Sequence, residues 1–354
     1  MEIVADYPDA QSWDSYVENH PQGRYCHLFA YRALEGVYGY KPHYFGFLRQ
    51  DRLVGVLPMF EASSLLFGKR LVSQPFSEYG GFLVDDDWSE PEFRQALEAV
   101  EAFAAARGVS ELELHGRQGL PAGRWPEHLA LSNAQHCAWL ALDRPLEALY
   151  EQVVTHQVRK AVQKARREGV TAEEASDSET LRRRFFPLYV SSMKRLGTPS
   201  HGLRFYLAAK QAFGDKMRIV WAFSQGAPIA GLLGFSCGRR VNIINIVSDE
   251  RYWELRPNDL VHWEYIEWAH RSGFRVFDFG SIRYEGQLKY KRKWGCTIEE
   301  HGYYFPRWNA GRNDYGTFDS SSSAMDRMSH LWAKFVPVPV ARAAGPLLRR
   351  HLVR

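Results

Sequence analysis

Apolar runs separated by short polar turns predict a β-hairpin at two places in the chain. Residues 44–59 contain two apolar runs around a polar turn at Gln50. Residues 217–235 repeat this pattern around a turn at Gln225. Apolar runs of this length around a polar turn are typical of paired strands. The two turns lie 225 − 50 = 175 positions apart.

A second pattern, a helix end followed by a glycine and a strand, also occurs twice. Residues 103–116 contain it around Gly108, and residues 268–280 contain it around Gly273. Glycine after a helix is a common stop signal. These two glycines lie 273 − 108 = 165 positions apart. Two units at similar offsets indicate a duplicated α/β domain, although hairpins and helix–glycine–strand turns are common enough for a coincidental repeat.

The length of the chain, 354 residues, agrees with a two-domain reading. We expect an N-terminal domain over residues 1–145 and a C-terminal domain over residues 146–320. Residues 321–354 would then form a basic and apolar tail. That tail either docks on a domain or lies at an inner membrane surface, and its prolines, which interrupt any long amphipathic helix, favour docking.

The segment Leu146–Gly169 predicts a basic amphipathic helix between the two repeats. Apolar residues recur at helical spacing, and the other faces carry cations that include Arg159 and Lys160. The helix is either a solvated connector or a basic wall that faces phosphates or RNA. The next predicted helix, Ser178–Arg195, ends before a Gly-Thr-Pro loop at Thr198, which either borders a site or simply terminates the helix.

Composition and charge bound the possible functions. The net charge of +4 is too small to argue for nucleic acid. The four cysteines are scattered, and neither they nor the histidines show metal-ligand spacing, so we expect no metal site and no disulfide framework. No signal peptide and no apolar run of about 18 residues occur. We therefore expect a cytoplasmic protein.

The candidate chemistry lies in residues 276–296. A short apolar run carries Asp278 and breaks on Gly280, and three lysines and an arginine then surround Tyr290 and Trp294. A strand that ends in an acid and a glycine before a basic, aromatic element suits a cleft for an anionic, partly apolar ligand. The same residues are also compatible with a strand cap, a turn and a solvated basic surface.

Several motifs together resemble the Fem-type branch of the GNAT-like acyltransferases, and in particular the FemAB-like proteins associated with exosortase, PEP-CTERM and polysaccharide-export systems. The resemblance covers roughly residues 10–305, and the order and spacing of the motifs carry it. They are Tyr38-Gly39-Tyr40-Lys41-Pro42, Gly55-Val56-Leu57-Pro58, Leu71-Val72-Ser73-Gln74-Pro75-Phe76-Ser77-Glu78-Tyr79-Gly80-Gly81, Gly197-Thr198-Pro199, Pro257-Asn258-Asp259-Leu260, Phe277-Asp278-Phe279-Gly280 and Tyr290-Lys291-Arg292-Lys293-Trp294-Gly295.

The resemblance implies a tandem pair of GNAT-like domains. Fem proteins move an aminoacyl group from aminoacyl-tRNA to an amine of a cell-wall precursor, and acetyltransferase-like members use an acyl thioester such as acyl-CoA. The acceptor here would be a small-molecule or lipid-linked precursor of the cell envelope or of exopolysaccharide. In each case an amine attacks an activated carbonyl, so catalysis depends on positioning and on oxyanion stabilisation.

The same resemblance assigns roles to residues of this chain. Lys291 would polarise the acyl carbonyl or stabilise its negative charge, and Asp278 would orient the site or accept a proton. Arg159 and Lys160 would contact the donor. In the first domain, the segment that contains Ser77, Glu78 and Tyr79 would line the acceptor cleft. Ser77, Glu78 and Tyr79 are therefore candidates for substrate contact. The remaining candidates are Thr198, Gly280, Tyr290 and Trp294.

The chain departs from the family pattern in two respects. The usual coenzyme A loop, Q/R-x-x-G-x-G/A, is not present in clear form, and the coiled-coil arm with which many Fem enzymes hold tRNA is not seen. The donor therefore stays open between acyl-CoA and charged tRNA. Two rivals also stay open: a non-catalytic scaffold that binds an envelope component or a nucleotide-sugar, and an RNA-binding module.

Overall fold

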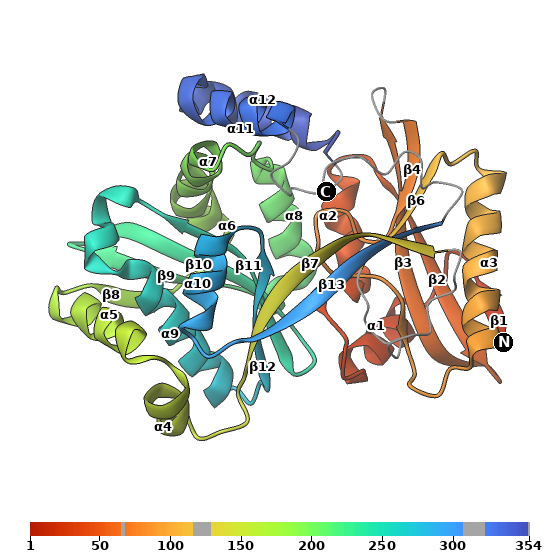
Figure 1. Ribbon diagram of the computed structural model, residues 1–354, viewed down its shortest axis with the longest axis horizontal. Coiled ribbons are helices and arrows are strands. Elements are labelled where there is room, and N and C mark those ends of the chain that lie inside the picture. Colours follow the sequence, from red (N-terminus) through yellow and green to blue (C-terminus); the bar gives the residue numbers. More distant parts are fainter. Residues whose placement is uncertain (65–67, 116–128, 307–322, 353–354) are drawn as a thin grey trace. The chain divides into compact units, whose positions relative to one another are not determined.

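The computed structural model describes residues 1–64, 68–115, 129–306 and 323–352, and they form two compact units of mixed α/β structure (Figure 1). Unit 1 comprises residues 1–135, 300–318 and 350–354. Unit 2 comprises residues 136–299 and 319–349. The expected α/β class is confirmed. The proposed division at residues 320 and 321 lies outside the described residues.

Unit 1 is built on a sheet with the strand order β1-β2-β3-β4-β6-β13, and β5 also pairs with β3. Strands β4 and β6 are parallel because α3 connects them, and the other pairs are antiparallel. Its elements are β1 (Glu2–Val4), α1 (Ala10–Asn19), η1 (Tyr25–His27), η2 (Phe29–Tyr31), α2 (Arg32–Gly36), β2 (Lys41–Arg49), β3 (Arg52–Ser64), β4 (Gly68–Val72), β5 (Leu83–Val84), α3 (Glu90–Ala106), β6 (Glu111–His115) and β13 (Thr297–Pro306).

Unit 2 has the strand order β7-β12-β11-β10-β9-β8. Its elements before the α9 crossover are β7 (Leu129–Ala141), α4 (Leu146–Ala148), η3 (Leu149–Val153), α5 (His156–Arg167), β8 (Thr171–Glu174), α6 (Ser178–Thr180), η4 (Leu181–Phe185), α7 (Phe186–Arg195), α8 (Leu203–Phe213), η5 (Gly214–Lys216), β9 (Met217–Ser224), β10 (Ala227–Cys237) and β11 (Arg240–Ser248). The others are η6 (Glu250–Leu255), α9 (Pro257–Arg271), β12 (Val276–Ile282), α10 (Glu285–Arg292), α11 (Ser323–Phe335) and α12 (Val338–Arg349).

The two units repeat one topology, which confirms the predicted tandem fold. In each unit an antiparallel hairpin leads to a third strand, and a helix then crosses to a parallel fourth strand. Both hairpin turns have a left-handed residue at the predicted position, with φ of 49° at Gln50 and at Gln225. Gly108 and Gly273 also have positive φ, at 65° and 82°, as the stop after a helix requires.

One predicted helix is interrupted. The pattern over Leu146–Gly169 suggested a continuous helix, but Val154 is extended and α5 begins only at His156. The Arg159 guanidinium donates to the carbonyls of Glu151 and Val154 at 2.7 and 2.5 Å, and so satisfies the carbonyl groups that the break exposes. The apolar spacing of α5 itself was predicted correctly, because its Val158, Val162 and Ala165 are buried.

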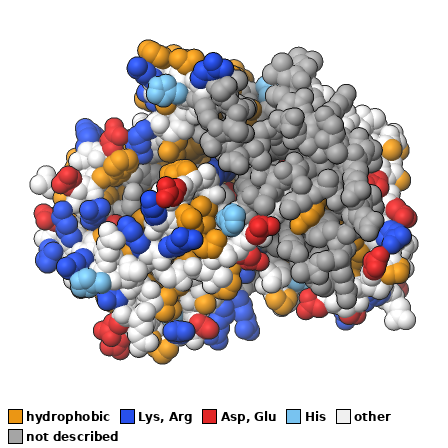
Figure 2. All heavy atoms as spheres, viewed as in Figure 1, with side chains coloured by type: hydrophobic (Ala, Val, Ile, Leu, Met, Phe, Trp, Pro, Cys, Tyr) orange, Lys and Arg blue, Asp and Glu red, His pale blue; other side chains and the backbone are white. Residues whose placement is uncertain are grey.

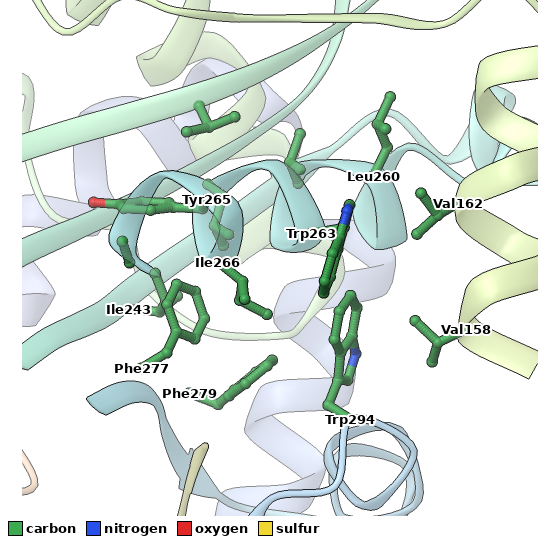
Figure 3. Close-up of a cluster of buried hydrophobic side chains, with 14 of the residues drawn as sticks. Val158, Val162, Ile243, Leu260, Trp263, Tyr265, Ile266, Phe277, Phe279 and Trp294 are labelled. Atoms are coloured by element: carbon green, nitrogen blue, oxygen red, sulfur yellow. The ribbon is translucent and has the colours of Figure 1, made fainter. Parts of the chain in front are cut away.

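The main core of unit 2 lies between its sheet, α5 and α9 (Figure 3). Leu260, Trp263 and Ile266 of α9 are buried in it, as their spacing predicted. Trp294, which is fully buried, lies beside Trp263 and faces Val158 in Figure 3. The core therefore fixes the segment after α10 against α9 and α5.

The C-terminal residues form two helices, and α12 packs on α7. Ala341, Gly345 and Arg349 are its buried positions, one turn apart. A side chain at Gly345 would begin 2.7 Å from the Ser200 hydroxyl, so the close approach requires glycine. The tail is thus docked, as its prolines suggested. No helix of the described residues is long and apolar enough to cross a membrane.

Candidate functional site

The sheet of unit 2 opens between β11 and β12. The two strands pair only from Arg240 opposite Val276 to Asn242 opposite Asp278. On the other side of β12, the register with β7 shifts between Asp278 and Ser281. The carbonyl groups in this part of β12 therefore need partners from outside the ladder.

Lys291 of α10 supplies those partners. Its ammonium group donates to the carbonyls of Phe279, Gly280 and Ser281 at 2.7, 2.8 and 2.6 Å. An ammonium has three N–H donors, and these three bonds use them all. The side chain is also buried. Lys291 therefore holds the opened part of β12 in place, and offers a hydrogen bond to a ligand only by releasing a carbonyl.

Gly280 and Asp278 shape the same turn. Gly280 has a φ of 72°, a conformation that favours glycine, and its N–H donates to the Asp278 carboxylate at 2.9 Å. Asp278 is fully buried and lies 3.4 Å from the Arg240 guanidinium. The carboxylate thus faces the protein framework, and the structure brings Asp278, Gly280 and Lys291 together.

A second group of side chains lies next to Lys291 and joins α9 to α10. The Tyr290 hydroxyl lies 3.2 Å from His262 Nδ1, and the Asp259 carboxyl lies near enough to Tyr290 for each group to influence the pKa of the other. The His262 ring stacks on Phe279, with centroids 5.2 Å apart, and its Nδ1 lies 2.7 Å from the Asn258 carbonyl. We did not predict a role for Asp259 or His262, although their spacing of three places them on one face of α9.

Burial sets the protonation states of this group. Burial raises the pKa of Asp259 to about 6, and it lowers the pKa of His262 to about 4. Burial, together with the negative charge of Asp259, raises the pKa of Tyr290 well above its ordinary value. Near neutral pH, Asp259 is therefore a carboxylate, His262 is neutral and Tyr290 keeps its proton. An acid with a pKa near the working pH is well placed to accept a proton.

The other predicted residues of unit 2 lie apart from this group. Trp294 is enclosed in the core and presents no surface to a ligand. The Arg159 guanidinium donates hydrogen bonds to carbonyls before α5, whereas Lys160 is exposed. Thr198 follows α7 in a loop whose Gly197 carbonyl accepts a hydrogen bond from Ser329 of α11 at 3.1 Å.

In unit 1, Ser77, Glu78 and Tyr79 belong to the loop that follows β4. The Ser77 carbonyl lies 2.9 Å from His115 Nδ1, and the Arg24 guanidinium lies over the Tyr79 ring at 3.7 Å. Positive φ values of 53° at Gln74, 63° at Phe76 and 113° at Gly80 occur within this loop. Backbone strain of this kind is concentrated at functional sites.

A surface hollow of about 670 Å³ also lies in unit 1. Tyr16, His20, Arg52 and Asp85 are among the residues that line it, and none of the predicted site residues does. Within the described residues, no three His, Cys, Asp or Glu side chains are grouped so that they could hold a metal ion. All four cysteines are free thiols.

Comparison with known families identifies one domain of the protein. Residues 153–292, which contain α5, α9, β12 and α10, match the family described as an acetyltransferase (GNAT) domain. This part of the chain is a GNAT domain. The match includes Asp259, His262 and Lys291, so the group described above lies inside the GNAT domain. No curated protein matches the chain.

Solved structures show that the fold of most of the chain resembles that of FemX. FemX has a TM-score of 0.71 at 14% identity, over 88% of this chain and 98% of that chain. The C-terminal domain of a putative lysylphosphatidylglycerol synthetase from Agrobacterium fabrum has a TM-score of 0.54 at 11% identity, over 84% and 90%. A tandem GNAT protein from the clavulanic acid biosynthesis pathway has a TM-score of 0.50 at 12% identity, over 86% and 98%. These likenesses establish the FemAB-like tandem fold.

The start of α9 is poorly suited to a pyrophosphate, the group that a GNAT coenzyme A loop binds. Helix N-termini hold phosphates through free backbone N–H groups and the positive end of the helix dipole. Here the first helical residue is Pro257, which has no N–H, and the first turn also carries Asp259. The first turn of α9 therefore offers one N–H fewer, and one negative charge more, than would suit a phosphate.

Proposed function

We propose that this GNAT protein is a cytoplasmic N-acyltransferase or aminoacyl transferase that acts on an amine of a cell-envelope or exopolysaccharide precursor. The GNAT family match and the likeness to FemX over most of both chains support it. The name of the Agrobacterium relative denotes an enzyme that makes an aminoacylated lipid. This relationship supports a small-molecule or lipid-linked acceptor.

The observation that carries the proposal is the contact of Tyr290 with both Asp259 and His262, beside the opening of the sheet. In the proposed reaction, the acceptor amine forms a C–N bond to the acyl carbon, and the bond from that carbon to the donor oxygen or sulfur breaks. The amine loses one proton, which passes to Asp259 through the Tyr290 hydroxyl. The departing oxygen or sulfur then recovers one proton, so the charge balances.

Lys291 acts in this scheme mainly as a positioning residue. Its ammonium fixes the carbonyls of residues 279–281 and so keeps β12 apart from β11. Its positive charge also lies next to the opening, where a negative charge develops on the acyl oxygen during attack. Gly280 keeps the turn narrow. Arg159 supports the segment before α5, and the exposed Lys160 stays a candidate contact for an anionic donor.

For the acceptor, we propose the strained loop of unit 1 that contains Ser77, Glu78 and Tyr79. Glu78 is only partly buried, and its carboxylate suits a cationic amine. Thr198 stays a candidate for substrate contact in unit 2. For the donor, the start of α9 favours an aminoacyl ester, such as charged tRNA, over acyl-CoA, because Pro257 and Asp259 do not suit a pyrophosphate.

A thermal-shift panel of acyl-CoAs, charged tRNAs and nucleotide-sugars tests the proposal. A ligand at about 100 times its Kd stabilises a protein by about 2.7 kcal/mol. We expect a charged tRNA to raise the melting temperature more than the uncharged tRNA, and to lose its acyl group to an added amine precursor. Stabilisation by a nucleotide-sugar alone, without transfer from any donor, would favour the scaffold reading.

A further inference from the structure

The two C-terminal helices of unit 2 expose an unusual amount of apolar surface. Among the described residues, eleven large hydrophobic side chains are exposed, and seven of them lie between Met328 and Leu348. Phe335 is 65% exposed and Leu347 is 70% exposed. Single exposed apolar residues need no explanation, but a concentration of them marks an interaction site.

These side chains form continuous stripes along the helices. Met328, Leu331 and Phe335 are spaced by three and four residues, so they share one face of α11. On α12, the buried positions Ala341 and Gly345 face α7, whereas Val340 and Leu347 are exposed. The docking of α12 therefore uses one face and leaves another apolar face uncovered. In Figure 2, hydrophobic and basic side chains lie together over these helices at the top of the view.

The charge of the two helices is mostly basic, and Asp326 is the one acid in their sequence. Arg327, Lys334 and Arg342 are exposed on α11 and α12, and no Asp or Glu occurs from residue 327 to residue 354. Basic residues beside an apolar helix face are typical of helices that lie in the interface of an anionic membrane. A second copy of this chain on the same patch would bring several basic side chains together, with only Asp326 of these two helices to pair them.

We propose that α11 and α12 form a docking surface for an anionic lipid bilayer, with the stripe from Met328 to Phe335 and the exposed side chains of α12 in the headgroup region. Arg327, Lys334 and Arg342 contact lipid phosphates in this arrangement. The surface does not depend on the proposed acyl transfer. It is compatible with a lipid-linked acceptor, and it requires no membrane-spanning helix.

Vesicle sedimentation without any substrate tests the docking surface. The full chain should bind vesicles in which about a third of the lipid is phosphatidylglycerol, and bind pure phosphatidylcholine vesicles much less. Leu331→Ser with Phe335→Ser should lower the partition coefficient about tenfold or more, because two apolar side chains leave the interface. Arg327→Gln with Lys334→Gln should weaken binding to the anionic vesicles and reduce its dependence on salt.

Matched controls keep the test decisive. Tyr284→Ser removes an exposed apolar side chain elsewhere in unit 2 and should leave vesicle binding unchanged. Each variant should keep the wild-type circular dichroism spectrum, since the replaced side chains are exposed. Equal binding by the wild type and the Leu331→Ser, Phe335→Ser variant would overturn the proposal. So would a wild-type dimer that the double variant converts to monomer, without vesicle binding by either protein.

Discussion

The guanidinium of Arg240 lies 3.4 Å from the carboxylate of Asp278, across the register pairs that join β11 to β12. Unit 1 contains a related arrangement, because Arg70 lies 3.9 Å from Glu113 across β4 and β6, although Arg70 is also hydrogen-bonded to Glu111. In each unit, the arginine is the first residue of its strand to pair with the parallel strand. The acid, Asp278 or Glu113, is the last paired residue of that parallel strand. A duplicated, buried ion pair at the same topological position indicates a framework role for Asp278.

The framework role predicts a large effect of Asp278 on stability. Asp278→Ala should lower the free energy of unfolding by about 3 kcal/mol, because Arg240 would keep a buried charge without this partner. Chemical denaturation of both proteins measures the difference. Glu90→Ala breaks the exposed ion pair with Arg94, and should cost no more than about 0.5 kcal/mol. Similar small costs at both positions would contradict the framework role.

Lys291 should be essential for the opened part of β12. Lys291→Met leaves three carbonyls without their donor, and at the two buried ones each lost partner costs about 1–3 kcal/mol. We therefore expect a clearly lower melting temperature together with lost transfer activity. Lys289→Met is the control, since Lys289 is exposed and pairs with Glu285 on the same helix. If both variants melt like the wild type, the hydrogen bonds do not hold the strand.

The sequence was most informative where structure is local. The hairpins at Gln50 and Gln225 follow from apolar runs around a turn, and the stops at Gly108 and Gly273 follow from glycine's access to positive φ. The break at Val154 was not predictable, because the spacing of the valines continues across it and the carbonyl partners come from Arg159, five residues away.

In the candidate site, too, the sequence showed the local motifs but not the contacts between distant residues. The motif around Lys291 and Gly280 was visible in the sequence, but its hydrogen bonds depend on a register shift of β12 that no sequence pattern records. Tyr290 and His262 are 28 positions apart, so their contact exists only in the folded chain. Trp294 belongs to a motif of the family, yet its ring is enclosed in the core.

Gly280 should be more sensitive to substitution than a glycine with the same backbone. Gly280→Ala and Gly273→Ala both place a side chain at positive φ, which costs about 1–2 kcal/mol. At Gly280 the new Cβ would also lie 3.2 Å from the Ile243 carbonyl, whereas at Gly273 it meets nothing within 4 Å. We expect a larger loss of stability in Gly280→Ala than in Gly273→Ala, and lost transfer activity only in Gly280→Ala. Equal activities of the two variants would argue against a site at this turn.

His262 should make the protein less stable in acid. Its pKa is about 4 in the folded protein because of burial, below the ordinary value of about 6.5 in an unfolded chain. The unfolded state therefore takes up a proton first, and the contribution of His262 to the free energy of unfolding falls as the pH drops from about 6.5 to 4. His262→Gln should show a smaller fall over this window in denaturation curves measured at each pH. An unchanged slope would mean that His262 is not held neutral.

The central claim is that Asp259, through Tyr290, accepts the proton of the attacking amine. The direct measurement is the rate of acyl transfer by the wild type and by Asp259→Asn over the pH range around 6, with the donor and amine found by the ligand panel. We expect the wild-type rate to rise as Asp259 ionises near pH 6, and Asp259→Asn to lose about 10²-fold in kcat and this pH dependence. A variant that transfers at the wild-type rate with the same pH profile would contradict the account.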